Sequence, residues 1–468
     1  MRNAAIVGSV LVFAACSLAP AHTRPELASA PEYPAVYEGD SATAGTSASE
    51  IEWREFIVDD RLEALIGLAL ENNRDLSMFT SRIDEARGFY RIQGADRLPT
   101  IGVRGDATRT RSGAAASGAS AGSDPVTFDR YSIGVGASVF ELDFWGRVRN
   151  LSEAARSQYL ATVQAQRAFR LSLIRQVAST YLASVEAEER LRLAEATVAS
   201  RSEGLRIAQV RFEAGITSGL DYRQAESLLM QAETQLAGLR LAQAQLQNSL
   251  AVLVGSRGGE TLPAPRSLTE QSSGIRLDPG LPSDLLLARP DIIAAEEQLR
   301  AARANIGAAR AAFFPSISLT GSLGFASSDL DNLLGDDGLT WSFGPSVNLP
   351  IFDGGRRRGN LTVAEAREDI AIANYEVTVQ EAFREVADAL AGRRFLAEQV
   401  AAQERATQAQ REIAELARTR YDEGVVGYIE VLDAERNLFS AEQALLQLRR
   451  SEAENLVTLY VVLGGGLT

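Results

Sequence analysis

The sequence predicts a mainly α-helical protein with a small β part. Three observations support this: long helical stretches without proline, four short segments that alternate apolar and polar residues, and a duplication of the whole pattern. The segment around Gly215 recurs around Gly424, 209 positions later. A glycine can adopt the positive φ that often ends a helix. Each half is therefore expected to hold one antiparallel helical hairpin, with its tip near residue 215 or residue 424.

Composition excludes several classes of function. The 468 residues carry a net charge of -14, which does not suit binding to nucleic acid phosphates. All 47 basic residues are arginine, so a phosphate loop that depends on lysine is excluded. The single histidine, His22, leaves no histidine for acid–base catalysis or a multi-histidine metal site in the folded part. No nucleophile elbow is present, so we expect neither an enzyme nor a bound cofactor.

The N-terminal sequence predicts an export signal followed by a lipid anchor. Residues 1–15 contain Arg2 followed by an apolar run too short to span a bilayer, and are expected to be a cleaved signal peptide. Cys16 follows two small residues and is the only cysteine, so we expect it to carry the acyl chains, palmitate among them. Residues 16–56 are then a lipidated linker. The alternative is ordinary signal cleavage with a spectator cysteine.

The first repeat is expected to span residues 57–255. Its strands are predicted at about 100–109 and 130–140, because Tyr131, Ile133, Val135, Ala137 and Val139 alternate with small polar residues. A helix of about 68 residues, about 100 Å long, leads to the tip near 215. The return helix carries leucine and alanine at heptad spacing, which indicates a coiled-coil seam.

The second repeat is expected to span residues 284–468, after a connector at 256–283. Its strands are predicted at about 316–325 and 341–349, and its hairpin tip near 424. The four strands have the length that spans an outer membrane. Four strands leave two open edges, which lipid does not tolerate, so several chains must close one transmembrane β-barrel. The long helices then form a tube beneath it, and together they make a conduit.

Three motifs stand out in the sequence: Cys16-Ser17-Leu18-Ala19-Pro20, the pair of segments Arg289–Ile292 and Ala308–Ile317, and Tyr428–Arg436. Together they resemble the TolC-like outer-membrane factors, in the branch of NodT/OprM-type efflux lipoproteins. The resemblance covers essentially the whole chain.

The resemblance implies a homotrimer with a twelve-stranded barrel and a periplasmic α-helical barrel, and it places the connector in an equatorial region. It implies a porin-like exit channel for transport and multidrug efflux in the outer membrane. The implied partners are outer-membrane lipid, a periplasmic adaptor (membrane fusion protein) and an inner-membrane pump of the resistance-nodulation-division type.

The resemblance also assigns candidate sites. Asp433, with Glu430 and Ile429, is expected to narrow the periplasmic end of the resting pore. The alternative is that these are solvated acids near a helix N-terminus, where negative charge is favourable. Val426 stands where some relatives have arginine, so an Arg–Asp lock with Asp221 is not supported.

Two further groups of residues are candidates. The expected adaptor-docking residues are Gly215, Thr217, Ser218, Gly424 and Gly427, which are also simply turn residues. Tyr131, Phe325 and Trp341 are expected in an aromatic girdle at the membrane interface, although lone aromatics also serve ordinary packing.

Two other functions are consistent with parts of the pattern. A type I protein-secretion exit duct would share the fold, and the lipoprotein-like start favours small-molecule efflux. A structural coiled-coil envelope protein with no transport role would not need four membrane-length strands.

Overall fold

The computed structural model describes residues 17–25, 46–113, 126–255, 262–271, 277–278 and 289–466. The expected signal peptide, Cys16, the middle of the linker and most of the connector lie outside these ranges. The chain divides into two compact units: one of Met1–Pro25, Ile83–Thr162 and Ala295–Tyr375, the other of Glu26–Arg82, Val163–Ala294 and Glu376–Thr468.

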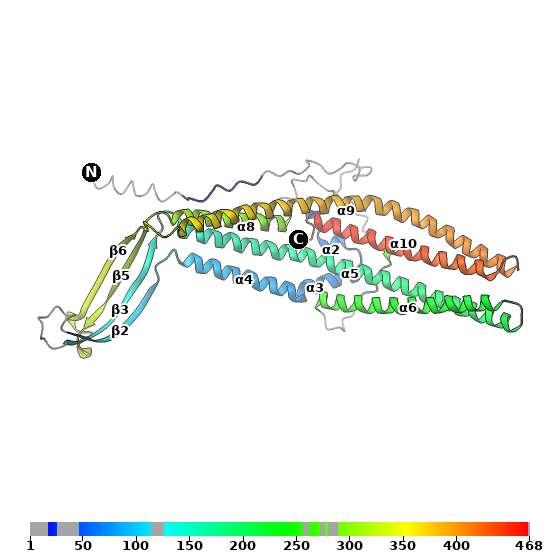
Figure 1. Cartoon of the computed structure of the whole chain (residues 1–468), viewed down its shortest axis with the longest axis horizontal. Coiled ribbons are helices and arrows are strands. Elements are labelled where there is room, and N and C mark those ends of the chain that lie inside the picture. The colour runs from blue at the N-terminus through cyan, green and yellow to red at the C-terminus, as the bar shows by residue number, and fades with distance from the viewer. Residues whose placement is uncertain are drawn as a thin grey trace. The chain divides into compact units, whose positions relative to one another are not determined.

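The elements are labelled in Figure 1. The helices are α2 (Trp53–Phe56), α3 (Asp60–Asn72), α4 (Arg74–Ala95), α5 (Arg147–Glu213), α6 (Gly219–Val254), α8 (Pro290–Ala311), α9 (Arg356–Asp422) and α10 (Tyr428–Val462), with short 3-10 turns η3 (Ala48–Glu50), η4 (Leu268–Glu270), η6 (Leu330–Asn332) and η7 (Asp336–Gly338). The strands are β1 (Thr46–Ser47), β2 (Ile101–Ser112), β3 (Val126–Leu142), β4 (Leu277–Asp278), β5 (Ser316–Ser327) and β6 (Leu339–Asn348). The prediction of a mainly helical chain with a small β part is confirmed.

The first unit contains an antiparallel sheet in the order β2-β3-β5-β6. Residues directly opposite each other in such a sheet point to the same side. Ile133 lies opposite Phe325, and Leu323 lies opposite both Val135 and Trp341. One face is therefore apolar across all four strands. The other face carries serine, threonine, glycine and charged residues, so the predicted alternation is confirmed at the level of the whole sheet.

A β-bulge corrects one detail of that prediction. The register of β3 against β5 shifts between Ala137 and Phe140, so that Phe140 pairs with Leu319. The predicted alternation through Val139 was therefore wrong, because the extra residue of the bulge changes the phase of the strand. Phe140 takes the place on the apolar face instead. The shift also keeps Glu141 on the polar face, where Arg147 contacts it at 2.5 Å.

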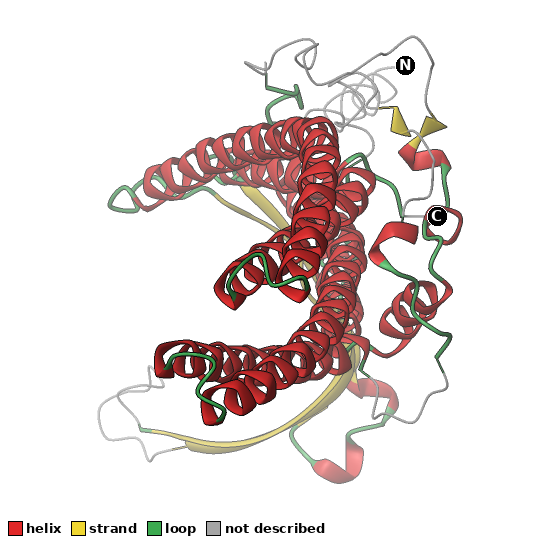
Figure 2. Ribbon diagram, turned by 90° about the vertical axis from the view of Figure 1, so that its right-hand side faces the viewer, coloured by secondary structure: helices red, strands yellow, loops and turns green. Residues whose placement is uncertain are grey.

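The strands approach closely on the polar side of the sheet. A Cβ atom on Gly324 would lie 2.3 Å from the carbonyl oxygen of Ile133, and one on Gly134 would lie 2.8 Å from that of Leu323. Glycine in a strand often marks such a close approach or a tight bend. The sheet is visibly curved (Figure 2), and the crowding indicates that its polar face is the concave one.

The second unit is built from two helical hairpins, α5–α6 and α9–α10, which run side by side (Figures 1 and 2). Helices α5 and α9 each have 67 residues, so the duplication is exact in the length of these helices. The predicted heptad seam is buried at Leu229, Ala232, Leu236 and Leu239. Among the described helices, none is both long enough and apolar enough to cross a membrane.

Asp59 organises the core of the second unit. It is fully buried, and its carboxylate accepts hydrogen bonds from the Arg61 and Leu62 amides at the start of α3. It also accepts from the Tyr181 hydroxyl at 2.7 Å and from the Gln271 amide at 2.8 Å. One side chain thus caps a helix and joins α3, α5 and the segment after α6. Burial and the bond to Asp59 raise the pKa of the Tyr181 phenol.

We expect Asp59→Ala to destabilise the protein by about 2–4 kcal/mol, because it removes a helix cap and leaves buried donors without an acceptor. The measurement is thermal unfolding of the detergent-solubilised protein. Asp60→Ala, at the exposed neighbouring carboxylate, is the matched control. Equal melting temperatures for the two variants would contradict this role of Asp59.

Candidate functional site

The first hairpin tip is a tight turn between α5 and α6. Gly215 has a φ of 71°, and its N–H donates to the Phe212 carbonyl at 2.9 Å. The Ile216 N–H donates to the Arg211 carbonyl at 2.8 Å. This is the Schellman arrangement, which satisfies the free carbonyls at a helix end. The turn therefore needs glycine at position 215 for conformational reasons alone.

A capping box begins the return helix at this tip. The Asp221 N–H donates to the Ser218 hydroxyl, and the Asp221 carboxylate accepts from the Ser218 N–H. The same carboxylate accepts from the hydroxyls of Thr217, at 2.7 Å, and Ser218, at 2.9 Å. These hydrogen bonds, with Thr217 first, hold the pKa of Asp221 below its ordinary value. Thr217 and Ser218, two expected docking residues, are thus fixed by the turn.

The second tip has the same turn but a different cap. Gly424 has a φ of 74°, and its N–H and that of Val425 repeat the two backbone bonds of the first tip. The residue equivalent to Ser218 is Gly427, which offers no side chain to cap α10. Glu430, the equivalent of Asp221, instead contacts Arg420 at 2.5 Å across the hairpin. The two tips therefore share a backbone and differ in electrostatics.

The three expected gate residues lie on the first turns of α10 and are exposed. Glu430 pairs with Arg420, and Asp433 pairs with Arg436 at 3.1 Å, one turn further along the same helix. Ile429 is about half exposed. Within one chain the two acidic side chains therefore bind different arginines.

The expected girdle aromatics share one face of the sheet. Phe325 lies opposite Ile133, and Trp341 lies opposite Leu323 in the next row on that face. Tyr131 lies one row beyond Ile133. Trp341 is 75% exposed, although tryptophan is usually largely buried.

A partly buried polar cluster of Arg201, Tyr428 and Glu435 was not identified from the sequence. Arg201 of α5 is buried and donates to the Leu228 carbonyl at 2.9 Å, and burial lowers its pKa. Burial raises the pKa of Glu435 on α10, although Arg418, at 3.8 Å, and Arg201 oppose the shift. Burial raises the pKa of Tyr428 to about 12. A Cβ on Gly204 would overlap the Tyr428 hydroxyl, so a larger residue there would require the tyrosine ring to shift.

One contact joins the two tips directly. The Arg211 guanidinium lies 5.1 Å from the centre of the Tyr421 ring and donates a hydrogen bond to its hydroxyl. Tyr421 in turn lies against Tyr428, with ring centres 5.1 Å apart. The sequence indicated both tips but offered no signal for this connection.

In the first unit, the N-terminal strap (residues 17–25) is bound to α8. Glu296 of α8 is buried and contacts the His22 imidazole at 2.9 Å and the Arg24 guanidinium at 3.1 Å. Burial acts to raise the pKa of Glu296, but the hydrogen bonds from His22 and Arg24 outweigh it, so the pKa lies below its ordinary value. Arg303 donates to the Thr23 carbonyl at 2.7 Å and pairs with Glu368 of α9. The strap is therefore held by buried charges.

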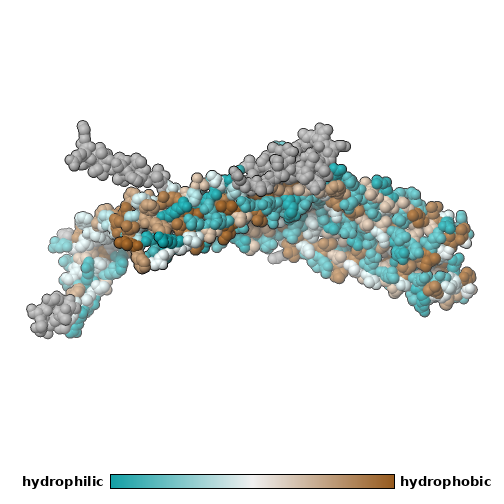
Figure 3. All heavy atoms as spheres, turned by 45° about the horizontal axis from the view of Figure 1, so that its top comes forward, coloured by the Kyte–Doolittle hydropathy of each residue, from teal (hydrophilic) through white to brown (hydrophobic). Residues whose placement is uncertain are grey.

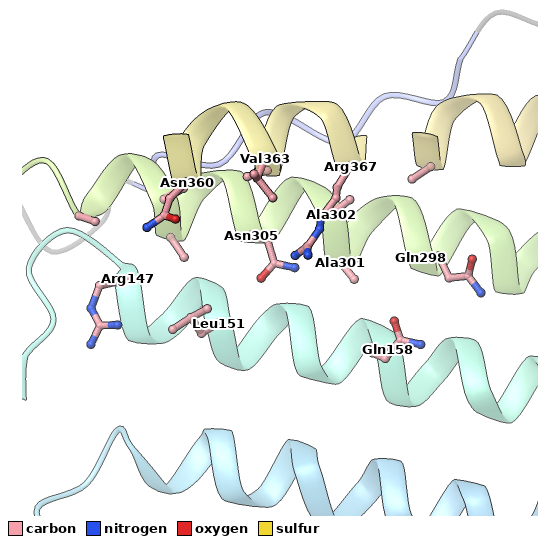
Figure 4. Close-up of a pocket in the computed structure, with 15 residues that line it drawn as sticks. Arg147, Leu151, Gln158, Gln298, Ala301, Ala302, Asn305, Asn360, Val363 and Arg367 are labelled. Carbon is pink, nitrogen blue, oxygen red and sulfur yellow. The ribbon is translucent and has the colours of Figure 1, made fainter. Parts of the chain in front are cut away.

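The opposite side of α8 lines a groove of about 540 Å³ with the N-terminal parts of α5 and α9. Figure 4 shows Asn305, Asn360 and Arg367 around it. Its floor is formed mainly by alanines of α8. Among the described residues, no cluster of three or more acidic, histidine or cysteine side chains is arranged to hold a metal ion. On the visible surface of the long hairpins, hydrophilic and hydrophobic residues are interspersed (Figure 3).

Comparison with known proteins identifies the class. The sequence profile described as "Outer membrane efflux protein" matches residues 65–256 and 281–465. The chain belongs to this family. It is an efflux channel of the outer membrane rather than an enzyme, as the sequence predicted.

Individual relatives match over nearly their whole length. The chain is 42% identical over 460 residues to the solvent efflux pump outer membrane protein SrpC of Pseudomonas putida, covering 98% of this chain and 97% of the relative. It is 40% identical to the cation efflux system protein CusC of Escherichia coli, with 97% of each covered. The open-state structure of the MtrE outer membrane channel of Neisseria gonorrhoeae is similar, with a TM-score of 0.87 and 38% identity over 97% of this chain and 99% of that one.

We expect the side-chain cap to stabilise the turn at the first tip, whereas the turn at the second tip has no side-chain cap to lose. Asp221→Ala should speed amide exchange of residues 214–225 about fivefold, the factor that corresponds to about 1 kcal/mol for a lost cap. Glu430→Ala, at the equivalent position, should not loosen the second turn comparably. Hydrogen-exchange mass spectrometry measures both. Equal effects at the two tips would show that the capping box is unimportant.

The lowered pKa of Asp221 also determines how the stability of the first tip changes with pH. The stability that the carboxylate contributes is fully present above the ordinary aspartate pKa. It is lost as the pH falls through the lowered native pKa. Acidification should therefore loosen the first tip of the unmodified protein but not of Asp221→Ala.

Proposed function

We propose that three copies of this chain form the passive exit duct of a tripartite efflux system for small molecules. The observation that carries the proposal is the four-stranded sheet with one apolar face and two open edges. Its edge strands β2 and β6 run in opposite directions, because all three pairings between them are antiparallel. Strand β6 of one copy can therefore pair with β2 of the next copy, and this pairing is also antiparallel.

The number of copies follows from the width that the barrel interior needs to conduct small molecules. Two copies would make eight strands, and an eight-stranded barrel is filled by its own side chains or holds one small ligand. Three copies make twelve strands and a wider interior. The concave polar face would line this interior, and the apolar face with Tyr131, Phe325 and Trp341 would meet the lipid. The first and second repeats, at 57–255 and 284–468, would each supply half of one copy's wall.

The partners and cargo are proposed from the relatives. Their names describe efflux of solvents and of cations by proteins about 40% identical to this chain. Such different cargo suggests that selection occurs elsewhere, in an inner-membrane pump of the resistance-nodulation-division type. A periplasmic adaptor would then dock on the tip residues Gly215, Thr217, Ser218, Gly424 and Gly427. Helices of 67 residues reach about 100 Å, far enough to meet such an adaptor.

Asp433, with Glu430 and Ile429, is the proposed constriction at the periplasmic end. Around a threefold axis each of these positions forms a ring of three. Like charges in such a ring repel unless they are counterbalanced, and Arg420 and Arg436 supply the counter-charges in each chain. The constriction can therefore be both narrow and acidic.

Asp433→Ala should raise the single-channel conductance in planar bilayers and lower the preference for cations, because it removes both bulk and charge from the narrowest ring. Glu188→Ala, which removes an exposed acid paired with Arg192 far from the tips, is the matched control. A conductance unchanged from the unmodified channel would exclude Asp433 from the constriction. A protein that forms no conducting pore at all would refute the proposed duct.

Lipid attachment at Cys16 is a separate proposal, supported by the export signal before it. The unmodified protein should carry acyl chains, detected by its intact mass and by incorporation of labelled palmitate. Cys16→Ser should lose both signals. An unmodified mature protein of unacylated mass would contradict lipidation and leave ordinary signal cleavage.

A further inference from the structure

The apolar face of the sheet becomes basic at the end that carries the β2–β3 hairpin. Helices α4 and α5 join the opposite end of these two strands. Near the hairpin, Tyr131 of β3 lies opposite Ala107 of β2. The next row on the same face pairs Arg109 with Asp129, and Arg111 lies one row further along β2. Residues two positions apart in a strand point to the same side. The two arginines therefore extend the apolar face beyond its aromatic residues.

Both arginine side chains are open to solvent. The Nε atom of Arg109 contacts an Asp129 carboxylate oxygen at 3.0 Å, and the Arg109 side chain is still 77% exposed. A guanidinium has five N–H donors, so a contact at Nε leaves its terminal amino groups available. Arg111 is exposed and has no ion-pair partner in the part of the chain that the structure describes. The Cα atoms of the two arginines lie about 7 Å apart, the length of two residues of a strand.

The length of the apolar face places the arginines at the level of lipid headgroups. On β3 this face runs over the nine residue steps from Ile133 to Leu142, the bulge included. At about 3.3 Å a step and a tilt of about 40°, these steps span about 23 Å along the membrane normal, close to the apolar band of about 25 Å of such barrels. Arg109 lies one row beyond Tyr131, about 5 Å further out. The headgroup layer is about 5–7 Å thick, so both guanidinium groups can reach it.

The basic character is confined to this place on the apolar face. Arg104 of β2 and Arg130 of β3 belong to the polar face, where Arg104 pairs with Asp106 at 2.8 Å. The connection between β5 and β6 is acidic, with four aspartates between positions 329 and 337. Within the described strands of this sheet, Arg109 and Arg111 are the basic residues of the apolar face. With Asp129 they carry a net charge of +1.

We propose that Arg109 and Arg111 bind the phosphate groups of lipid headgroups in the outer leaflet of the membrane. Arginine binds phosphate through charge-assisted, often bidentate hydrogen bonds. The acyl chains of the same lipid would contact the apolar rows that begin at Ile133. One lipid molecule can thus meet both the charged and the apolar part of this face. Asp129 positions the Arg109 guanidinium on this face.

This inference rests on the proposed duct, because the apolar face meets lipid only if the sheet forms part of a barrel wall. It also goes beyond the duct. A barrel wall needs an apolar face of sufficient height, whereas it does not need two arginines directly above that face.

The test is lipid binding to the detergent-solubilised full-length protein, measured by native mass spectrometry. The probe is lipid A with both of its phosphates, and dephosphorylated lipid A is the comparison. Arg109→Gln with Arg111→Gln should weaken binding of the phosphorylated lipid about thirtyfold, because each arginine near a charged lipid surface contributes about a factor of five. The dephosphorylated lipid should bind this variant and the unmodified protein equally. Millimolar inorganic phosphate should not displace the phosphorylated lipid.

The matched control is Arg104→Gln with Arg130→Gln. It removes the same two charges from the same sheet, but from the polar face, and should bind phosphorylated lipid A as the unmodified protein does. The mass of each intact assembly verifies that the variants still fold and associate.

Three results would overturn the lipid site and leave the duct intact, provided that the protein still conducts in planar bilayers. They are unchanged lipid binding by the Arg109 and Arg111 double variant, equal losses in the two double variants, and displacement of the lipid by inorganic phosphate, which would indicate a site for free anions. An unmodified protein that forms no conducting pore would refute the duct and the lipid site together.

Discussion

The rest of the architecture depends on one constraint: backbone N–H and C=O groups at a strand edge cannot remain unpaired in hydrocarbon. The sheet of the first unit has four strands, an apolar face made from all of them, and two edges without a partner in the described residues. The proposed duct satisfies this constraint, because its copies pair edge to edge.

Much of the fold could be predicted because it rests on local patterns. Apolar and polar residues that alternate with a period of two predict a strand, and apolar residues at heptad spacing predict a packed helix. The structure shows both, as the two-faced sheet and as the buried seam from Leu229 to Leu239. The exception, Val139, shows the limit of this method. A bulge is a relation between two strands, and one strand's pattern does not show where its partner loses register.

The candidate site was predictable only in part, for a related reason. Both glycine turns were visible because helix ends have their own residue preferences. The two tips differ at two pairs of equivalent positions: Ser218 and Asp221 form a capping box, whereas Gly427 provides no cap and Glu430 pairs with Arg420. The partly buried polar cluster joins Arg201 to Tyr428 and Glu435, which lie more than 200 positions further along the chain. Each of them has the character of an ordinary helix surface residue until the two hairpins are placed side by side.

The strap along α8 has a consequence for the proposed lipid anchor. Glu296 and Arg303 bind residues 17–25 to α8, in the same unit as the sheet. If Cys16 carries the proposed acyl chains, they are attached one residue before a segment that is bound to α8. The attachment point and the strands would then belong to one compact unit, so the acyl chains would limit the depth of the strands in the bilayer.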